Sequence, residues 1–417
     1  MKRRPSGFRG GRVALTLLSV LVLAVTGTIW WSTNLVIGGF DVSRALAEAK
    51  VAKSTGGAAN ILVMGLDSRK DRNGDDLPAD VLQQLHAGDG SNGGYNTNTL
   101  ILLHVPADGK KVVAFSIPRD DYVSLVGVKS REKGKIKEAY GLRKAEVADQ
   151  LAAQGVSGRD LEEQSRESAR AATLATVERL VGVPIDHFAE VSLVGFYDLA
   201  KTLGGVEVCL NNPVRDGYSG AAFPAGRQKL NAAQSLAFVR QRHGLADGDL
   251  DRTHRQQAFI AGVMVQLQKQ GVFSDVRKLQ SLISVAQQDV VVSDGWDLEQ
   301  FARQVGQIAG TDLTFTTLPV TGYANVGDQA VNLVDAKAIR AQVQKAFGQS
   351  IPDPADEEES TSTSPAADAP KQVGYTEAAA PATTSAPATT PVGPTVAPGP
   401  TPDAGTTLRG GEIPCVD

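Results

Sequence analysis

The chain contains little cysteine and no excess of positive charge. Its 417 residues include two cysteines, Cys209 and Cys415, which are too few for a scaffold of several disulfides or for a structural zinc site. Lysine and arginine number 42 against 46 aspartates and glutamates, for a formal net charge of −4. Because nucleic-acid-binding proteins usually present a strongly basic surface, this balance gives no reason to expect nucleic acid as a partner.

Charge is also missing from a long stretch near the N-terminus. Residues 1–12 hold five basic residues and no acid, whereas residues 13–40 hold no charged residue. Residues 13–31 are long and apolar enough to span a bilayer, and Trp30 and Trp31 suit its outer interface. We therefore expect a cytoplasmic segment at 1–12, a transmembrane helix at 13–31 and an extracytoplasmic remainder. A cleaved signal peptide is the competing interpretation.

The segments on either side of the central part are short of large apolar residues. Residues 32–56 are expected to form a stem with a short helix over 41–53. Residues 349–417 form a tail rich in Pro, Thr and Ala, which predicts disorder over 352–411. The last segment, 410–417, differs because it contains Ile413, Cys415 and Val416.

The two cysteines allow two interpretations. If both lie in an oxidising compartment, a disulfide between Cys209 and Cys415 would tie the end of the tail to the folded domain. The alternative is a buried free Cys209 with a free or intermolecular Cys415.

Between these ends, strand patterns alternate with helix patterns. Apolar runs predict strands at 60–65, 99–105, 111–117, 185–191, 206–210 and 313–320. Helical periodicity predicts helices at 135–154, 160–181, 193–203, 229–237, 251–270 and 335–347. This order favours an α/β domain over residues 57–348, with a mixed central sheet flanked by helices.

Three polar residues stand at the ends of the first three strands. If these strands pair antiparallel in sequence order, Asp67, Asn98 and Arg119 all lie at the same edge of the sheet. Loops at such an edge commonly carry binding and catalytic residues on a rigid scaffold. The alternative is that Asp67 and Asn98 are ordinary turn residues and that Arg119 pairs with Asp120 on the surface.

A second group of polar residues lies within residues 237–257. Arg240 and Arg242 are two apart, so they share a face if this segment is extended. Arg252 and Gln256 lie on one face of the expected helix 251–270, which becomes apolar in its later turns. Because guanidinium groups match the oxygens of phosphate, this arrangement suits an anion site. A solvated charged loop is the alternative.

Several ordered blocks resemble the LytR–CpsA–Psr family over roughly residues 57–348, with details similar to its actinobacterial members. The blocks include NILVMGLDSR (60–69), SIPRDDYV (116–123), KIKEAY (135–140), GGVEV (204–208), AFVRQRHG (237–244) and GDLDRTHRQQ (248–257). The resemblance implies a membrane-anchored extracytoplasmic transferase that moves a glycopolymer from a polyprenyl-pyrophosphate carrier to peptidoglycan. Such chemistry depends mainly on positioning and on neutralising charge.

The resemblance also implies roles for individual residues. Asp67 would help to hold Mg²⁺ on the pyrophosphate. The phosphates would be clamped by Arg119, Arg240, Arg242 and Arg252, with Gln256 assisting and Arg69 as a further candidate. The apolar residues that would hold the lipid tail cannot be distinguished from core residues by sequence.

The chain departs from the family pattern at two positions, because it lacks an arginine that would donate to phosphate and an aspartate that would bind the metal. The family commonly has Arg-Thr-Asp-Thr where this chain has Asn96-Thr97-Asn98-Thr99. Asn98 can still offer a carboxamide oxygen to the metal, but without charge. Two functions therefore stay open: a working phosphotransferase, or a catalytically weak relative that binds the lipid-linked substrate and regulates wall assembly. Hydrolytic release of the glycopolymer is a third, minor possibility.

Overall fold

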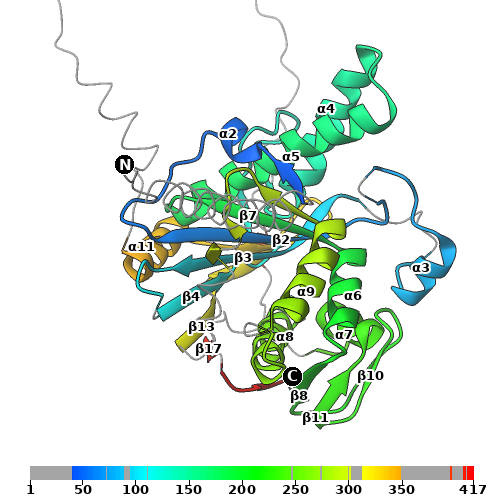
Figure 1. Cartoon of the computed structure of the whole chain (residues 1–417). Coiled ribbons are helices and arrows are strands. Elements are labelled where there is room, and N and C mark those ends of the chain that lie inside the picture. Colours follow the sequence, from blue (N-terminus) through cyan, green and yellow to red (C-terminus); the bar gives the residue numbers. More distant parts are fainter. Residues whose placement is uncertain are drawn as a thin grey trace, which may run out of the picture.

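A large mixed sheet lies at the centre of the molecule (Figure 1). The structure is a computed structural model that describes residues 40–71, 73–88, 94–109, 111–245, 248–272, 275–298, 300–301, 312–348, 395–396, 407–409 and 411–417. Within these residues the sheet has eight strands in the order β1-β12-β7-β2-β3-β4-β13-β17. They are β1 (Asp41–Ser43), β12 (Val290–Ser293), β7 (His187–Ser192), β2 (Ala59–Asp67), β3 (Asn96–Val105), β4 (Lys111–Ser116), β13 (Asp312–Thr317) and β17 (Thr407–Arg409).

Both strand directions occur within this sheet. Strand β3 is antiparallel to β2 and to β4, as the sequence predicted for the first three strands. The pairs β2–β7 and β4–β13 are parallel. The prediction of a mixed central sheet is therefore confirmed.

Helices cover both faces of the sheet because its central strands are apolar on both sides. Leu62 and Met64 of β2 face a core that includes Leu174 and Val177. The helices of this layer are α2 (Ala45–Ala49), α4 (Glu138–Ala153), α5 (Gly158–Val181) and α11 (Ala336–Phe347). In Figure 1, α2, α4 and α5 lie above the sheet.

The opposite face carries a second helical layer together with a small sheet. Ile61 and Val63 of β2 face this side and share a core with Ile260 of α8. The layer contains α6 (Leu193–Thr202), α7 (Ala232–Arg240), α8 (Asp249–Lys269) and α9 (Val276–Asp289), beside β8 (Val206–Leu210) and β11 (Gly226–Leu230). Helix α8 lies directly on β8 because Gly262 has no side chain; a Cβ there would collide with the main-chain oxygen of Glu207.

Shorter elements complete the fold. Helix α3 (Ala79–Gln84) lies between β2 and β3 in sequence. The small strands are β5 (Tyr122–Ser124), β6 (Lys133–Lys135), β9 (Val214–Asp216), β10 (Ala221–Phe223), β14 (Gly322–Val326), β15 (Gln329–Leu333), β16 (Thr395–Val396) and β18 (Cys415–Val416).

Three helix predictions were wrong in extent. The helix expected at 41–53 is instead strand β1 followed by α2. The helix expected at 229–237 is the end of β11 followed by α7, because Asn231 and Gln234 form a capping box that sets the start of α7. The helix expected from residue 135 begins at Glu138, since Lys135 belongs to β6.

Parts of the tail are paired with the domain, which corrects the expectation of continuous disorder. Strand β16 pairs with β14, β17 with β13, and β18 with β8. These edge strands offer main-chain donors and acceptors that a passing segment can satisfy. Cys209 and Cys415 form a disulfide, so the first interpretation of the cysteines is confirmed. The rest of the predicted disordered stretch lies outside the described residues.

The predicted cytoplasmic segment and transmembrane helix, residues 1–31, also lie outside the described residues. Among the helices that are described, none is both long enough and apolar enough to cross a membrane.

Candidate functional site

A bulge at the end of the β2–β3 pair sets the position of Asn98. Gly65 pairs with Thr99 and Leu66 pairs with Thr97, so Asn98 is an extra residue with no partner in the register. Such bulges turn a side chain out of the regular alternation. Gly65 is required here, because a Cβ would lie 2.9 Å from the Cβ of Thr99. The bulge places Asn98 beside Asp67, where β2 ends.

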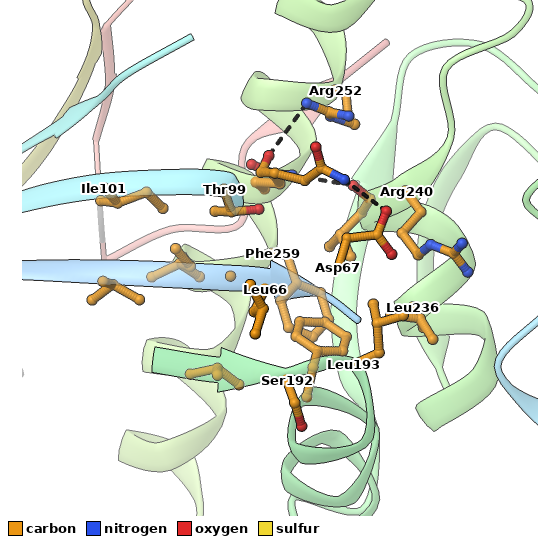
Figure 2. A pocket seen from close by; sticks show the side chains of 18 of the residues that line it. Leu66, Asp67, Thr99, Ile101, Ser192, Leu193, Leu236, Arg240, Arg252 and Phe259 are labelled. Carbon is orange, nitrogen blue, oxygen red and sulfur yellow. Dashed lines mark hydrogen bonds between the residues drawn. The ribbon is translucent and has the colours of Figure 1, made fainter. Parts of the chain in front are cut away.

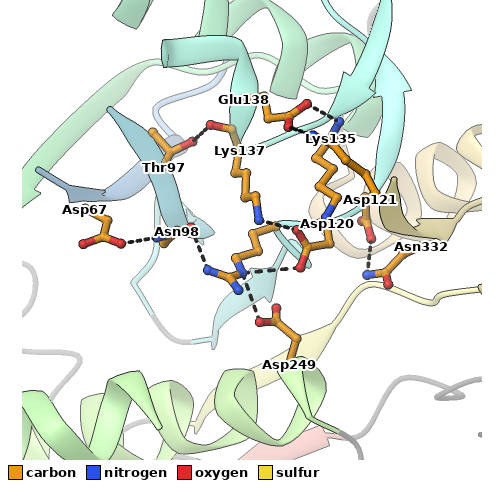
Figure 3. Close-up of polar contacts among 12 residues, drawn as sticks. Asp67, Thr97, Asn98, Asp120, Asp121, Lys135, Lys137, Glu138, Asp249 and Asn332 are labelled. Carbon is orange, nitrogen blue, oxygen red and sulfur yellow. Dashed lines mark hydrogen bonds and ion pairs between the residues drawn. The ribbon is translucent and has the colours of Figure 1, made fainter. Parts of the chain in front are cut away.

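Asp67, Asn98 and Arg119 form a continuous hydrogen-bonded chain (Figure 3). Asn98 Nδ2 donates to Asp67 Oδ2 at 2.7 Å, and Arg119 Nη1 donates to Asn98 Oδ1 at 2.8 Å. At the other end, Arg69 Nη1 donates to Asp67 Oδ1 at 2.9 Å. The convergence predicted from strand order is therefore confirmed, and the neighbouring charges set which way the Asn98 amide points.

Arg119 and Arg252 share a carboxylate that the sequence analysis did not single out. Arg119 Nε is 3.0 Å from Asp249 Oδ1, and Arg252 Nη2 is 2.9 Å from each oxygen of Asp249. Both arginines are only 4% exposed. Burial lowers the pKa of Arg252 to about 10, although the Asp249 carboxylate acts in the opposite direction. Asp249 and Arg252 are three residues apart at the start of α8, and this spacing was the sequence feature that could have predicted their ion pair.

The same Nε of Arg119 also lies near a second carboxylate, that of Asp120. Arg119 Nε is 3.5 Å from Asp120 Oδ2, and Lys137 Nζ is 2.6 Å from Asp120 Oδ1 (Figure 3). Burial would raise the pKa of Asp120, but Arg119 and Lys137 outweigh it and lower that pKa to about 2. Asp120 is therefore ionised at any physiological pH, and it fixes Arg119 rather than exchanging protons.

Arg240 is the last residue of α7, so the extended segment that would place it on one face with Arg242 is not present. Its Nη1 donates to the main-chain oxygen of Leu85 at 2.8 Å. Burial lowers the pKa of Arg240, and the Asp67 carboxylate opposes that effect. Arg242 follows the helix and is exposed. Gln256 Nε2 makes a long bond, 3.4 Å, to the main-chain oxygen of Val239.

These polar groups border a cavity of about 420 Å³ between the sheet and the helices α6, α7 and α8. Figure 2 shows Arg252, Asp67 and Arg240 together, with Leu193, Leu236 and Phe259 gathered below them in the view. The polar lining residues are Asp67, Arg69, Asn98, Thr99, Arg119, Ser192, Arg240, Arg242, Arg252 and Gln256. The apolar ones are Val63, Leu66, Ile101, Val191, Leu193, Phe196, Leu199, Leu236, Val239, Phe259, Ile260 and Val263.

All eight predicted site residues therefore line one cavity, whereas its apolar wall was missed. The apolar wall comes from β2, β3, β7 and the helices α6 to α8. No sequence signal separated these residues from the core, because both sets show the same apolar periodicity.

The donor set can be tested against Mg²⁺, which prefers carboxylate oxygens together with phosphate and water. Among the described residues no group of three or more His, Cys, Asp or Glu side chains could hold a metal ion. Asn98 turns its nitrogen to Asp67 and its oxygen to Arg119, so it does not present that oxygen to a cation beside Asp67. The set fits a cation that uses Asp67 as its single protein carboxylate and takes its other ligands from a bound phosphate.

The arrangement suits a ligand with an anionic head and an apolar tail. Five arginines line the same cavity as a wall of aliphatic and aromatic side chains. Guanidinium groups can donate in pairs to phosphate oxygens, and the apolar wall gains free energy when hydrocarbon replaces water.

Comparisons with known proteins agree with this geometry. The family model described as LytR_cpsA_psr matches residues 38–347. The cell wall biosynthesis protein LcpA of Corynebacterium glutamicum is 38% identical over 371 residues, covering 86% of this chain and 69% of that protein. The polyisoprenyl-teichoic acid–peptidoglycan teichoic acid transferase TagU of Oceanobacillus iheyensis is 27% identical over 289 residues, covering 67% of this chain and 75% of that protein.

A solved structure supports the fold. The crystal structure of protein gbs0355 from Streptococcus agalactiae aligns with a TM-score of 0.53 and 16% sequence identity, covering 75% of this chain and 99% of that one. The family model covers most of the chain, and the relative from Corynebacterium is similar over most of its own length. The chain belongs to the LytR–CpsA–Psr family.

Proposed function

We propose that this chain is a phosphotransferase that moves a glycopolymer from a polyprenyl-pyrophosphate carrier to peptidoglycan, and that residues 13–31 anchor it in the cytoplasmic membrane with the domain outside. The observation that carries the proposal is the cavity in which five arginines adjoin an apolar wall. The names of the relatives point the same way, since TagU is described as transferring teichoic acid to peptidoglycan.

The cavity matches the two chemically different parts of such a donor. The apolar wall would take the first isoprene units of the lipid, and the arginines would take the pyrophosphate. Because Arg119 and Arg252 are almost fully buried, their charges are weakly screened by water and act strongly on a bound anion. Asp249 lies between these two arginines, so an incoming phosphate would compete with it for the same donors.

The reaction would replace the phosphoanhydride bond to the carrier by a phosphoester bond to the acceptor. The acceptor hydroxyl oxygen forms a bond to the phosphorus that carries the glycan, and the phosphoanhydride bond breaks. Polyprenyl phosphate leaves with the bonding electrons, and the hydroxyl proton passes to water. The arginines lower the barrier by stabilising the charge on the transferring phosphate and on the leaving phosphate.

Mg²⁺ is also part of the proposal. Asp67 would hold it against the pyrophosphate, where the ion supplies further neutralisation of charge. Asn98 orients the groups beside it, since it donates to Asp67 and accepts from Arg119.

The second candidate function, a weak relative that binds the donor and regulates wall assembly, is favoured by one observation. The side chain that faces Asp67 is an amide N–H rather than a second carboxylate, so the metal site has less negative charge than two carboxylates would give it.

A transfer assay separates the candidates. The full chain in detergent, a short-chain polyprenyl-pyrophosphate glycan, peptidoglycan fragments and Mg²⁺ are incubated together, and products are identified by mass spectrometry. A phosphodiester between glycan and peptidoglycan is expected. Binding of the donor without product would favour the regulator, release of glycan phosphate to water would favour a hydrolase, and absence of donor binding would reject the proposal.

A further inference from the structure

A second cavity, of about 240 Å³, adjoins the proposed donor site. It is lined by Asp216, Tyr218, Ser219, Arg240, Arg242 and His243. Arg240 and Arg242 line both cavities. A ligand whose phosphates lie against these two arginines therefore borders both the apolar lining of the first cavity and this second cavity.

The turn that carries Tyr218 is held in place by hydrogen bonds to Asp216. It joins β9 to β10, in the hairpin beside α7 (Figure 1). Asp216 Oδ1 accepts from the Tyr218 main-chain N–H at 2.9 Å, and Asp216 Oδ2 accepts from Ser219 Oγ at 2.8 Å. Asp216 is 4% exposed, and the main-chain N–H of Arg242 also donates to it. Hydrogen bonds to Asp216 thus connect the β9–β10 hairpin to the segment that carries Arg240 and Arg242.

The side chain of Tyr218 is nevertheless open to solvent. It is 81% exposed and is one of two exposed large apolar side chains in the part of the chain that the structure describes. Its ring lies 4.4 Å from the His243 ring, tilted by 37°. Single exposed aromatic residues are common on protein surfaces, but this one is fixed at the rim of a polar cavity that continues from an anion site.

We propose that this second cavity binds a sugar, namely the one joined directly to the pyrophosphate of the donor; the inference depends on the proposed function. The donor consists of lipid, pyrophosphate and sugar in that order, and the protein offers an apolar wall, arginines and the Tyr218 cavity in the same order. A pyranose ring has an apolar C–H face that can stack on the Tyr218 ring. Its hydroxyl groups can accept hydrogen bonds from Arg242.

Two probes test the sugar site apart from the lipid site. One is a short-chain polyprenyl pyrophosphate that carries a single N-acetylhexosamine, and the other is the same polyprenyl pyrophosphate without sugar. The dissociation constant of each is measured by calorimetry for the full chain in detergent. The proteins are the natural chain, Tyr218→Ala, Tyr218→Phe and, as a remote control at the other exposed apolar side chain, Val42→Ala.

The natural chain is expected to bind the sugar-bearing probe about five-fold more tightly than the bare one, as a single stacking contact provides. Tyr218→Ala should lose this preference, while Tyr218→Phe and Val42→Ala should keep it. Equal affinity of the natural chain for both probes would overturn the sugar site and leave the proposed function standing. Failure to bind either probe would overturn both.

Two further results would also contradict the proposal. If Tyr218→Ala kept the full preference, the sugar would lie elsewhere. If Tyr218→Ala changed only the KM for the peptidoglycan acceptor in the transfer assay, the cavity would belong to the acceptor sugar and not to the donor.

Discussion

Arg255 is completely buried in α8 and donates from Nε to the main-chain oxygen of Asp417 at 2.6 Å. Its Nη1 donates to Gln241 Oε1, and Gln241 is itself only 1% exposed. Because Gln241 lies between Arg240 and Arg242 in sequence, one buried guanidinium connects the residue that follows β18 to the segment that carries two of the cavity arginines.

We expect Arg255→Met to weaken both connections. The buried acceptor on Gln241 and the exposed acceptor on Asp417 would lose their donor, and leaving the buried one unsatisfied typically lowers the free energy of unfolding by about 1–3 kcal/mol. The measurement is urea unfolding followed by circular dichroism. Arg277→Met, at an exposed arginine of α9, is the matched control and should change stability by less than about 0.5 kcal/mol. Equal stability of both variants would contradict a structural role for Arg255.

The disulfide should stabilise the same connection. We expect Cys209→Ser combined with Cys415→Ser to lower the free energy of unfolding by about 2–4 kcal/mol, because the bond closes a loop between residues 206 apart in sequence. Thermal unfolding with and without a reducing agent measures the effect. The double variant should be insensitive to the reducing agent. A natural chain that unfolds identically in both conditions would show that the bond contributes nothing.

Transfer activity should require arginine, and not merely a positive charge, at positions 119 and 252. Replacement of Arg119 or Arg252 by lysine is expected to reduce kcat/KM for transfer by about ten-fold or more, since a point charge cannot reproduce a two-pronged guanidinium. Both arginines also hold Asp249, so the unfolding temperature must be measured alongside activity. Arg227→Lys, on the exposed face of β11, is the control. Full activity of both cavity variants would remove these residues from the phosphate site.

The identity of residue 98 should control the affinity for metal. Asn98→Asp adds a second carboxylate beside Asp67 at nearly unchanged volume, so we expect tighter Mg²⁺ binding and faster transfer at limiting Mg²⁺. Without metal the two carboxylates repel each other, and the thermal stability of the variant should therefore rise when Mg²⁺ is added.

Calorimetric titration with Mg²⁺, with and without the pyrophosphate lipid, checks this prediction. Asn325→Asp, which adds the same charge on exposed β14, should behave like the natural chain. If Asn98→Asp had unchanged metal affinity and rate, residue 98 would have no part in a metal site.

The stability of the domain should depend on pH through Glu178. Burial raises the pKa of Glu178 to about 7, although the Ala52 N–H, which donates to Oε1 at 2.8 Å, partly opposes this. A carboxyl group with a raised pKa in the folded state favours folding below its ordinary pKa of 4.5, and this contribution is lost as the pH rises towards 7.

Glu178→Gln removes the titration, so the difference in unfolding temperature between the natural chain and the variant should change between pH 4.5 and pH 7 and then level off. Differential scanning calorimetry across this range is the measurement. Glu163→Gln, at an exposed position of the same helix, is the control. A constant difference at all pH values would exclude Glu178 as the titrating group.

Three polar residues of the candidate site were predictable because strand order alone brings them together. Asp67, Asn98 and Arg119 stand at the ends of three strands that pair in sequence order, so antiparallel pairing suffices to collect them. The bulge that turns Asn98 towards Asp67 was not predictable, because an extra residue leaves no mark on the apolar pattern of β3.

Asp249 was missed for a different reason. Its neighbours in sequence suggest a solvated acidic loop, and only the packing of α8 against Arg119 shows that it joins two buried guanidinium groups. The tail was misjudged in the same way. Its composition predicts disorder, but the free edges of β13, β14 and β8 are properties of the folded sheets and are invisible in the tail itself.

The pairing of β18 with β8 also constrains the timing of folding. Cys209 is synthesised 206 residues before Cys415, an interval of ~10–40 s at ordinary rates of translation. During that interval Cys209 has a free thiol, and the edge of β8 that later pairs with β18 has no strand partner. The bond that closes the domain must therefore be among the last to form, and any other thiol that meets the nascent chain competes with Cys415 for the same sulfur atom.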